Sequence, residues 1–284
     1  MKQVFRLELG KDNRIITGDI LAPTKPQGKA PVILLLHGFK AFKSWGFFPT
    51  LAKRLAKEGY VVISFNFSMN GVEYDQADEE VTNLDKFGRN TFSREQEDIA
   101  TVLKALRDGD LPYAELCDVT KVGLFGHSRG GANALIYTLD DPSINCAVVW
   151  NSVAEVLFWE EKTIQEIMEK GVAYIENVRT KQQLPVTKEV IEDIQANQDR
   201  FAFLNRFALD SRPVLAVVGT ADKERIVEGA KRLDRIAPHS DLQLIISGDH
   251  TFGSSHPLIT ISPMLEEAIG YTVEFYQEHL PTIK

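Results

Sequence analysis

The feature that most constrains the fold is an alternation of short, continuously apolar segments with longer segments of helical periodicity. Six apolar runs rich in β-branched residues recur along the chain: PVILLLHG, YVVISFNF, KVGLFGHS, INCAVVWNS, RPVLAVVG and LQLIISGD. Each has the length and composition of a strand buried on both faces. Helix-like segments such as FFPTLAKRLAKEG, SREQEDIATVLKALRDG and EGAKRLDRIA lie between them. This order predicts an α/β fold, with a mostly parallel sheet covered by helices on both faces.

Two parts of the chain differ from this alternation. The N-terminal segments QVFRLELG and RIITGDILAP are joined by the turn-like KDN and predict an antiparallel hairpin. Residues 153–208 contain no strand-like run and carry long amphipathic segments, so we expect a helical insertion there. The predicted organisation is a core formed by residues 1–152 and 209–284 with a helical cap at 153–208. The alternative is that these helices only enlarge the core.

Charge and hydropathy exclude several classes of partner. Forty acidic and 32 basic residues give a net charge of −8, which argues against a nucleic-acid-binding surface. No apolar run approaches the roughly 20 residues that cross a bilayer, and the N-terminal MKQVFRLELGKDNR does not resemble a secretory signal. We therefore expect a cytoplasmic protein with no membrane partner. Cys117 and Cys146 show neither CxxC nor metal-ligand spacing, and we expect reduced, packed thiols.

A candidate nucleophile lies in the GxSxG pattern formed by residues 126–130, GHSRG. The pattern follows the strand-like KVGLF and precedes the helix-like GANALIYTL. A strand-to-helix turn this sharp needs small residues at its two ends, and it raises the serine hydroxyl above the sheet. We therefore expect Ser128 to be a nucleophile and the backbone N–H of Arg129 to bind an oxyanion. The alternative is a glycine-rich connection with an incidental serine.

A serine hydroxyl becomes nucleophilic only when a base takes its proton, and the base must be oriented by a carboxylate. His250 follows the last buried strand in LIISGDHTFG and is the expected base, with His256 in GSSHP as the alternative. Asp222 directly follows the strand in VLAVVGTAD and is the expected carboxylate, ahead of Glu224 and Glu228 on the next helix. Serine, aspartate and histidine in this chain order, each after a strand, form a more specific signal than any one of them.

A second oxyanion donor is expected in the sequence HGF at residues 37–39. It follows the buried run PVILLL, and Gly38 allows the chain to turn so that the Phe39 N–H points toward the nucleophile. A plain strand-terminating turn is the alternative.

The segments HGF, GHSRG, GTAD and GDH together resemble those of the α/β-hydrolase superfamily over nearly the whole chain. Within it, the sequence is similar to bacterial dienelactone-hydrolase-like and cinnamoyl or feruloyl esterase-like enzymes. This resemblance implies an eight-stranded, mostly parallel sheet, the residue roles given above and no cofactor. The sequence departs from such enzymes at Arg129 and in the VVGT before Asp222, and its serine stands where dienelactone hydrolases proper use cysteine.

These patterns predict a serine carboxylesterase that acts on a small-molecule ester without a metal ion. The triad specifies acyl transfer and not the leaving group, so thioesterase and aminopeptidase-like activities are alternatives. A non-catalytic ligand-binding relative is a third, although such proteins usually lose a triad residue. Four aromatic residues of the insertion are predicted to line the substrate pocket, with inward packing as the alternative: Phe158, Trp159, Phe201 and Phe203.

Overall fold

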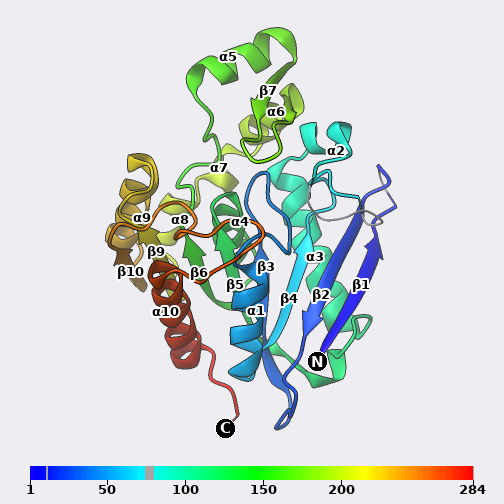
Figure 1. The fold of residues 1–284 in the computed structure, drawn as a ribbon, viewed down its shortest axis with the longest axis vertical. Coiled ribbons are helices and arrows are strands. Elements are labelled where there is room, and N and C mark those ends of the chain that lie inside the picture. The colour runs from blue at the N-terminus through cyan, green and yellow to red at the C-terminus, as the bar shows by residue number, and fades with distance from the viewer. Residues whose placement is uncertain (11, 74–79, 284) are drawn as a thin grey trace.

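The computed structural model describes residues 1–10, 12–73 and 80–283, which are built around an eight-stranded sheet in the order β1-β2-β4-β3-β5-β6-β9-β10 (Figure 1). The strands are β1 (Lys2–Glu8), β2 (Ile15–Leu21), β3 (Ala30–Leu36), β4 (Val61–Asn66), β5 (Cys117–His127), β6 (Ile144–Trp150), β9 (Val214–Gly219) and β10 (Ser240–Ile245). β1 and β2 form the predicted hairpin and β2 runs antiparallel to β4, while the other neighbours are parallel. The predicted eight-stranded, mostly parallel sheet is confirmed.

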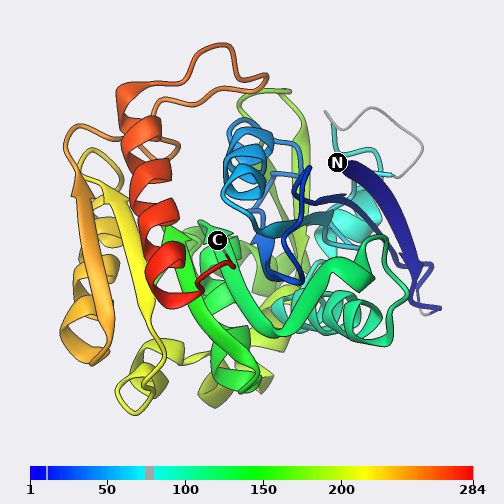
Figure 2. The same ribbon diagram turned by 90° about the horizontal axis from the view of Figure 1, so that it is seen from below.

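Helices cover both faces of this sheet. They are α1 (Phe48–Lys57), α3 (Phe92–Asp108), α4 (Arg129–Asp140), α9 (Glu224–Ile236) and α10 (Pro263–His279). Side chains of α3, α4 and α9 belong to one apolar cluster, and those of α1 and α10 to a second cluster on the opposite face. Figure 2 shows α1 in blue and α10 in red on the same side of the sheet. No helix of the described chain has both the length and the apolar character needed to cross a membrane.

The continuous apolar runs of the central strands follow from this two-sided burial. In β3, Ile33 and Leu35 join the cluster beneath α1 and α10, whereas Leu34 and Leu36 join the cluster beneath α3 and α4. Successive side chains of a strand point to opposite faces, so a sheet with two covered faces needs apolar residues at every position.

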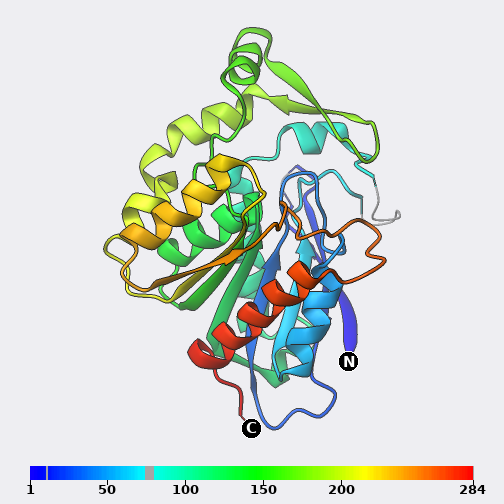
Figure 3. The same cartoon turned by 60° about the vertical axis from the view of Figure 1, so that its left-hand side comes forward.

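The segment predicted as a helical cap contains helices and also a small sheet. Its elements are α5 (Glu161–Lys170), β7 (Val172–Glu176), β8 (Gln183–Thr187), α6 (Lys188–Ala196), α7 (Gln198–Phe201) and α8 (Phe203–Phe207). In Figures 1 and 3, α5, β7 and α6 lie beyond one end of the central sheet. Two shorter helices, α2 (Leu84–Gly88) and the 3₁₀ turn η1 (Ala114–Leu116), complete the described elements.

The expectation of a purely helical insertion is wrong, because β7 and β8 pair as an antiparallel hairpin. The sequence EEKTIQEIMEKGVAYIENV has the pattern of one long amphipathic segment, but Gly171 adopts a φ of 83° and ends α5. A left-handed residue of this kind terminates a helix, and glycine adopts the conformation without steric cost. The following VAYIE is rich in the β-branched and aromatic residues that favour strands.

Residues 153–208 are joined to the rest of the molecule by several polar contacts. Thr187 Oγ1 donates to the Gly88 carbonyl oxygen over 2.9 Å, which fastens the end of β8 to α2. Arg94 of α3 donates to a carboxylate oxygen of Glu189 in α6 over 2.7 Å. Gln182 Nε2 donates to the Val81 carbonyl oxygen over 2.8 Å. These bonds hold the hairpin and α6 against the segments that lead into α2 and α3.

Candidate active site

Ser128 occupies a sharp turn between β5 and α4. Its backbone has φ 55° and ψ −119°, and α4 begins at the next residue. A Cβ on Gly126 would lie 2.2 Å from the Gly130 carbonyl oxygen, and a Cβ on Gly130 would lie 2.2 Å from the Leu36 carbonyl oxygen. Side chains are therefore excluded at both glycines of the GxSxG pattern, which is the steric reason that the sequence suggested.

The structure brings Ser128, His250 and Asp222 together at the carboxyl ends of β5, β10 and β9. His250 Nε2 lies 3.0 Å from Ser128 Oγ, and His250 Nδ1 lies 2.7 Å from Asp222 Oδ2. The Asp222 side chain is only 2% exposed, whereas that of His250 is 42% exposed. The carboxylate is thus shielded from solvent, whereas part of the imidazole is accessible.

The alternative base, His256, has a different position. Its Nδ1 accepts a hydrogen bond from the Gly46 N–H over 3.1 Å, and its ring stacks on Trp45 at an interplanar angle of 24°. Phe42 contacts the same ring edge-on, at a centroid distance of 4.9 Å. These contacts connect the His256 loop to the segment before α1, and the structure gives this histidine no place beside Ser128.

The predicted oxyanion positions both lie next to the nucleophile. A Cβ on Gly38 would lie 3.1 Å from Ser128 Cβ, so the loop after β3 runs directly against the serine, and Phe39 is its next residue. Arg129 is the first residue of α4, and N–H groups in the first turn of a helix have no acceptor within that helix. Phe39 and Arg129 therefore lie on the two segments that adjoin Ser128, which is the placement that the prediction requires.

The Arg129 side chain forms a buried ion pair that the sequence did not reveal. Its Nε donates to Glu95 Oε2 over 2.8 Å, and the two side chains are 2% and 3% exposed. The same oxygen accepts from Asn133 Nδ2 over 2.6 Å, and the guanidinium carbon lies 4.1 Å from the Phe92 ring centroid. The residue after the nucleophile thus ties α4 to α3. The unusual arginine after Ser128 was the one sequence feature that pointed to a buried ion pair, because nothing in the sequence identifies Glu95 as its partner.

Asn151 is a second residue that the sequence analysis missed. It is 1% exposed, and its Nδ2 donates to the carbonyl oxygens of Asp249 and His250 over 3.3 and 3.0 Å. Its Oδ1 accepts from the Gly219 N–H over 2.9 Å. One side chain therefore joins the loops that carry Asp222 and His250. A possible signal was its position directly after the strand INCAVVW, where the other site residues also follow strands.

Two further histidines, His37 and His127, brace the site loops in their neutral form. Burial lowers the pKa of His37 to about 4 and that of His127 to about 3. His127 Nε2 donates to the His250 carbonyl oxygen over 2.8 Å. His37 Nδ1 donates to the Gly38 carbonyl oxygen over 3.0 Å, and its Nε2 accepts from the Phe67 N–H over 3.2 Å. Each ring thus fixes one of the loops around Ser128.

The four aromatic residues predicted to line a pocket separate into two pairs. Phe158 and Trp159 are half-buried and stack with centroids 4.3 Å apart, and each lies within 6 Å of the Phe39 ring, at 5.8 and 5.9 Å. Phe201 and Phe203 are only 3% and 0% exposed and belong to the main core. The expectation that these two contact substrate is not met, because core packing leaves them no open surface. Phe158 and Trp159 remain candidates.

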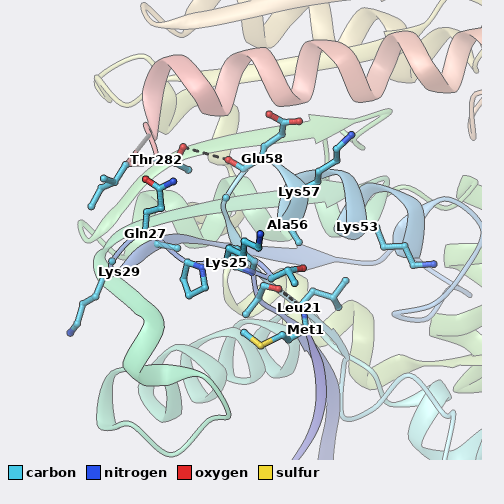
Figure 4. Close-up of a pocket in the computed structure, with 18 of the residues that line it drawn as sticks. Met1, Leu21, Lys25, Gln27, Lys29, Lys53, Ala56, Lys57, Glu58 and Thr282 are labelled. Atoms are coloured by element: carbon cyan, nitrogen blue, oxygen red, sulfur yellow. Dashed lines mark hydrogen bonds between the residues drawn. The ribbon is translucent and has the colours of Figure 1, made fainter.

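A large cavity in the molecule lies far from this site. It has a volume of about 840 Å³ and is lined by residues near both termini, among them Met1, Leu21, Lys57 and Thr282 (Figure 4). These residues surround the amino ends of β3 and β4, whereas Ser128 follows the carboxyl end of β5. Ligands of open α/β sheets bind at the carboxyl ends of the strands, so the cavity is not part of the candidate active site.

The sheet order and the serine-bearing turn are those of the α/β-hydrolase fold, and comparison with known proteins supports this fold. A family model described as the α/β hydrolase fold matches residues 31–171. The protein therefore has the α/β-hydrolase fold. A sequence search of curated proteins gives no match.

Several solved structures share the whole architecture at low sequence identity. Est1E from Butyrivibrio proteoclasticus has a TM-score of 0.69 at 14% identity, over 97% of this chain and 98% of that one. The esterase domain of a Rhodothermus marinus protein has a TM-score of 0.66 at 16% identity, over 99% of both chains. A dienelactone hydrolase from Anabaena variabilis has a TM-score of 0.61 at 14% identity, over 98% of this chain and 99% of that one. The chain thus resembles esterases and dienelactone hydrolases in fold.

Proposed function

We propose that the protein is a serine carboxylesterase that hydrolyses small-molecule esters through an acyl-enzyme on Ser128. The observation that carries this proposal is the uninterrupted contact chain from Ser128 Oγ through both nitrogens of His250 to Asp222, with distances of 3.0 and 2.7 Å. A nucleophile in contact with a base that is itself oriented by a carboxylate is the arrangement that acyl transfer requires.

In the first half-reaction, Ser128 Oγ attacks the ester carbonyl carbon while His250 Nε2 takes the hydroxyl proton. Negative charge develops on the carbonyl oxygen, where the N–H groups of Phe39 and Arg129 donate hydrogen bonds. Asp222 accepts the Nδ1 hydrogen bond and stabilises the imidazolium. The carbon–oxygen bond to the alcohol then breaks, and His250 gives its proton to the departing alkoxide, which leaves the acyl group on Ser128.

In the second half-reaction, a water molecule attacks the acyl-enzyme and gives its proton to His250 Nε2. The same two N–H groups stabilise the second oxyanion. When this intermediate breaks down, the bond to Ser128 Oγ is cleaved and the serine regains its proton from His250. The products are one carboxylic acid and one alcohol, and the enzyme returns to its starting state.

A labelling experiment combined with a substrate panel tests this function. A fluorophosphonate probe should label Ser128, and Ser128→Ala should abolish labelling and lower kcat by at least about 10⁴ while the protein stays folded by circular dichroism. Ser143→Ala, in the loop before β6, is the matched serine control and should retain activity. The rates of hydrolysis of an aryl ester, a thioester and an aminoacyl anilide, all followed by chromogenic detection, are then compared. This comparison shows which leaving group the enzyme prefers.

Ester turnover should exceed turnover of the thioester and the anilide. If Ser128→Ala keeps a tenth of the wild-type rate, the nucleophile is another residue. A folded wild-type protein that is neither labelled nor active on any of the three substrates would instead be a ligand-binding relative.

A further inference from the structure

Two lysine residues flank the candidate active site. Lys40 directly follows Phe39, and Lys223 directly follows Asp222. Lys40 Nζ donates to the carbonyl oxygen of Glu176, the last residue of β7, over 3.1 Å, and lies 5.8 Å from the Phe39 ring centroid. The cap hairpin therefore holds the Lys40 ammonium group above the loop that runs against Ser128.

The positive charge of Lys223 acts on the Lys40 ammonium group. Burial and the charge of Lys223 lower the pKa of Lys40, against a smaller opposing effect of Glu176. The Glu176 carboxylate itself pairs with Lys181 at 3.3 Å. Within the described part of the chain, neither Lys40 nor Lys223 forms an ion pair with a carboxylate. The Lys40 ammonium group has a neutral carbonyl oxygen as its hydrogen-bond partner, and the Glu176 carboxylate opposes its charge only partly.

Other half-buried cations of this protein are paired. Lys43, three residues after Lys40, contacts Asp19 at 3.0 Å, and Arg94 contacts Glu189 at 2.7 Å. The chain has an excess of eight negative charges, so carboxylates are not scarce. Two lysines without an ion-pair partner, one next to Phe39 and one next to Asp222, raise the local positive potential, and such a potential attracts and orients an anionic ligand.

We propose that the site prefers esters that carry a carboxylate group, which Lys40 and Lys223 bind. This inference rests on the proposed esterase function and specifies its substrate class. Lys40 is only two residues after Gly38, which packs against Ser128. Because this separation is short, one small molecule can place its carboxylate at Lys40 and its ester group at Ser128. A half-ester of a dicarboxylic acid has this arrangement. Lysine suits the task because its ammonium group is a compact point charge on a flexible stem.

A pair of matched substrates tests the proposal. Mono-para-nitrophenyl adipate and para-nitrophenyl hexanoate share the leaving group and the acyl chain length and differ in the terminal carboxylate. Wild-type kcat/KM should be higher for the adipate, and the ratio of the two values should fall about tenfold in the Lys40→Met, Lys223→Met double variant, since exposed ion pairs contribute about a factor of two to five each. The ratio should also fall when ionic strength rises from about 0.01 to 1 M.

Lys53→Met, Lys57→Met is the control, because it removes the same charge from α1 near the opposite end of the sheet and should leave both rates unchanged. A wild-type enzyme that hydrolyses the hexanoate as fast as the adipate overturns the proposal and leaves the esterase function standing. A double variant that keeps the wild-type ratio also overturns it. Absence of hydrolysis of either ester, together with absence of Ser128 labelling, is the separate result that contradicts the esterase function.

Discussion

The side chain of Asn151 holds the peptide group of His250, with Nδ2 3.0 Å from the histidine carbonyl oxygen. Oδ1 of the same side chain accepts a hydrogen bond from the N–H of Gly219, which is three residues before Asp222. The two loops that carry His250 and Asp222, the proposed base and carboxylate, are thus fixed relative to one buried residue. Catalytic groups need to be held within about 0.5 Å of their working geometry, and second-shell hydrogen bonds of this kind supply that precision.

Asn151→Ala should lower kcat by at least about tenfold and change KM much less, because it releases both loops while leaving the substrate pocket in place. Steady-state kinetics on an aryl ester measure the effect. Thr272→Val is the stability-matched control, since it removes the buried hydrogen bond from Trp150 Nε1, 2.9 Å long, on the neighbouring residue. If both variants lose stability and kcat to the same extent, Asn151 has only a structural role.

Glu95→Ala should destabilise the protein by about 3–5 kcal/mol, because it leaves the Arg129 guanidinium buried without a counter-charge. The free energy of unfolding in urea measures this loss. kcat should fall as well, because the proposed oxyanion donor is the N–H of the same arginine. Asp108→Ala removes an exposed ion pair with Lys104 on the same helix and should leave the urea midpoint nearly unchanged. Equal midpoints for the two variants would contradict this prediction.

His37 and His127 should make folding sensitive to acid. A histidine in the unfolded chain binds its proton near pH 6.5, whereas burial lowers the folded pKa of His37 to about 4 and that of His127 to about 3. The unfolded state therefore binds more protons in this window, and stability is complete above about pH 6.5 and is lost as the pH falls toward 4. The loss for each histidine is on the order of a few kcal/mol, at about 1.4 kcal/mol for each unit of pKa shift.

Urea unfolding of the wild type and of His37→Gln between pH 7.5 and 4.5 tests this prediction. The difference in stability between the two proteins should shrink as the pH falls, because the variant no longer has this buried base. Asp98 contributes in the opposite direction, since burial raises the pKa of its carboxyl group to about 6, but it is present in both proteins and cancels in the comparison. A difference that does not change with pH would argue against a buried neutral His37.

Aromatic substitutions in the cap should separate specificity from stability. Phe158→Ala or Trp159→Ala should change the ratio of kcat/KM between bulky aryl esters and acetyl esters by about tenfold for at least one of the two. Phe201→Ala should instead cost about 3–5 kcal/mol of stability and leave the ratio unchanged, because its side chain packs on Phe92 in the core, with centroids 5.7 Å apart. Unchanged ratios in all three folded variants would assign Phe158 and Trp159 to packing alone.

The sheet could be predicted because each buried strand is recognisable from its own short stretch of sequence. A strand such as β3 needs apolar residues on both faces, so its sequence carries the evidence without reference to its neighbours. The juxtaposition of Ser128, Asp222 and His250 could be predicted for a related reason, since each follows such a strand and parallel strands end at the same edge of the sheet.

The contacts between distant segments could not be predicted in this way. Glu95 lies in an amphipathic helix whose pattern does not distinguish a solvated carboxylate from one that meets a buried arginine. Periodicity also did not show that Phe201 faces inward while Phe158 lies near the site. In the cap, the single glycine at 171 separates a helix from a strand, and the apolar residues on both sides of it continue one apparent pattern.

The backbone of Ser128 has a consequence for how this sequence can change over time. With φ 55° and ψ −119°, the residue adopts a conformation that glycine accepts easily and that costs other residues about 1–3 kcal/mol. Replacement of this serine by glycine would relieve that cost, so selection for stability alone favours its loss. In a lineage that no longer needed the enzymatic activity, a change from serine to glycine at this position would be accessible and stabilising. Retention of a serine here, despite that cost, is what the proposed role of the Ser128 hydroxyl requires.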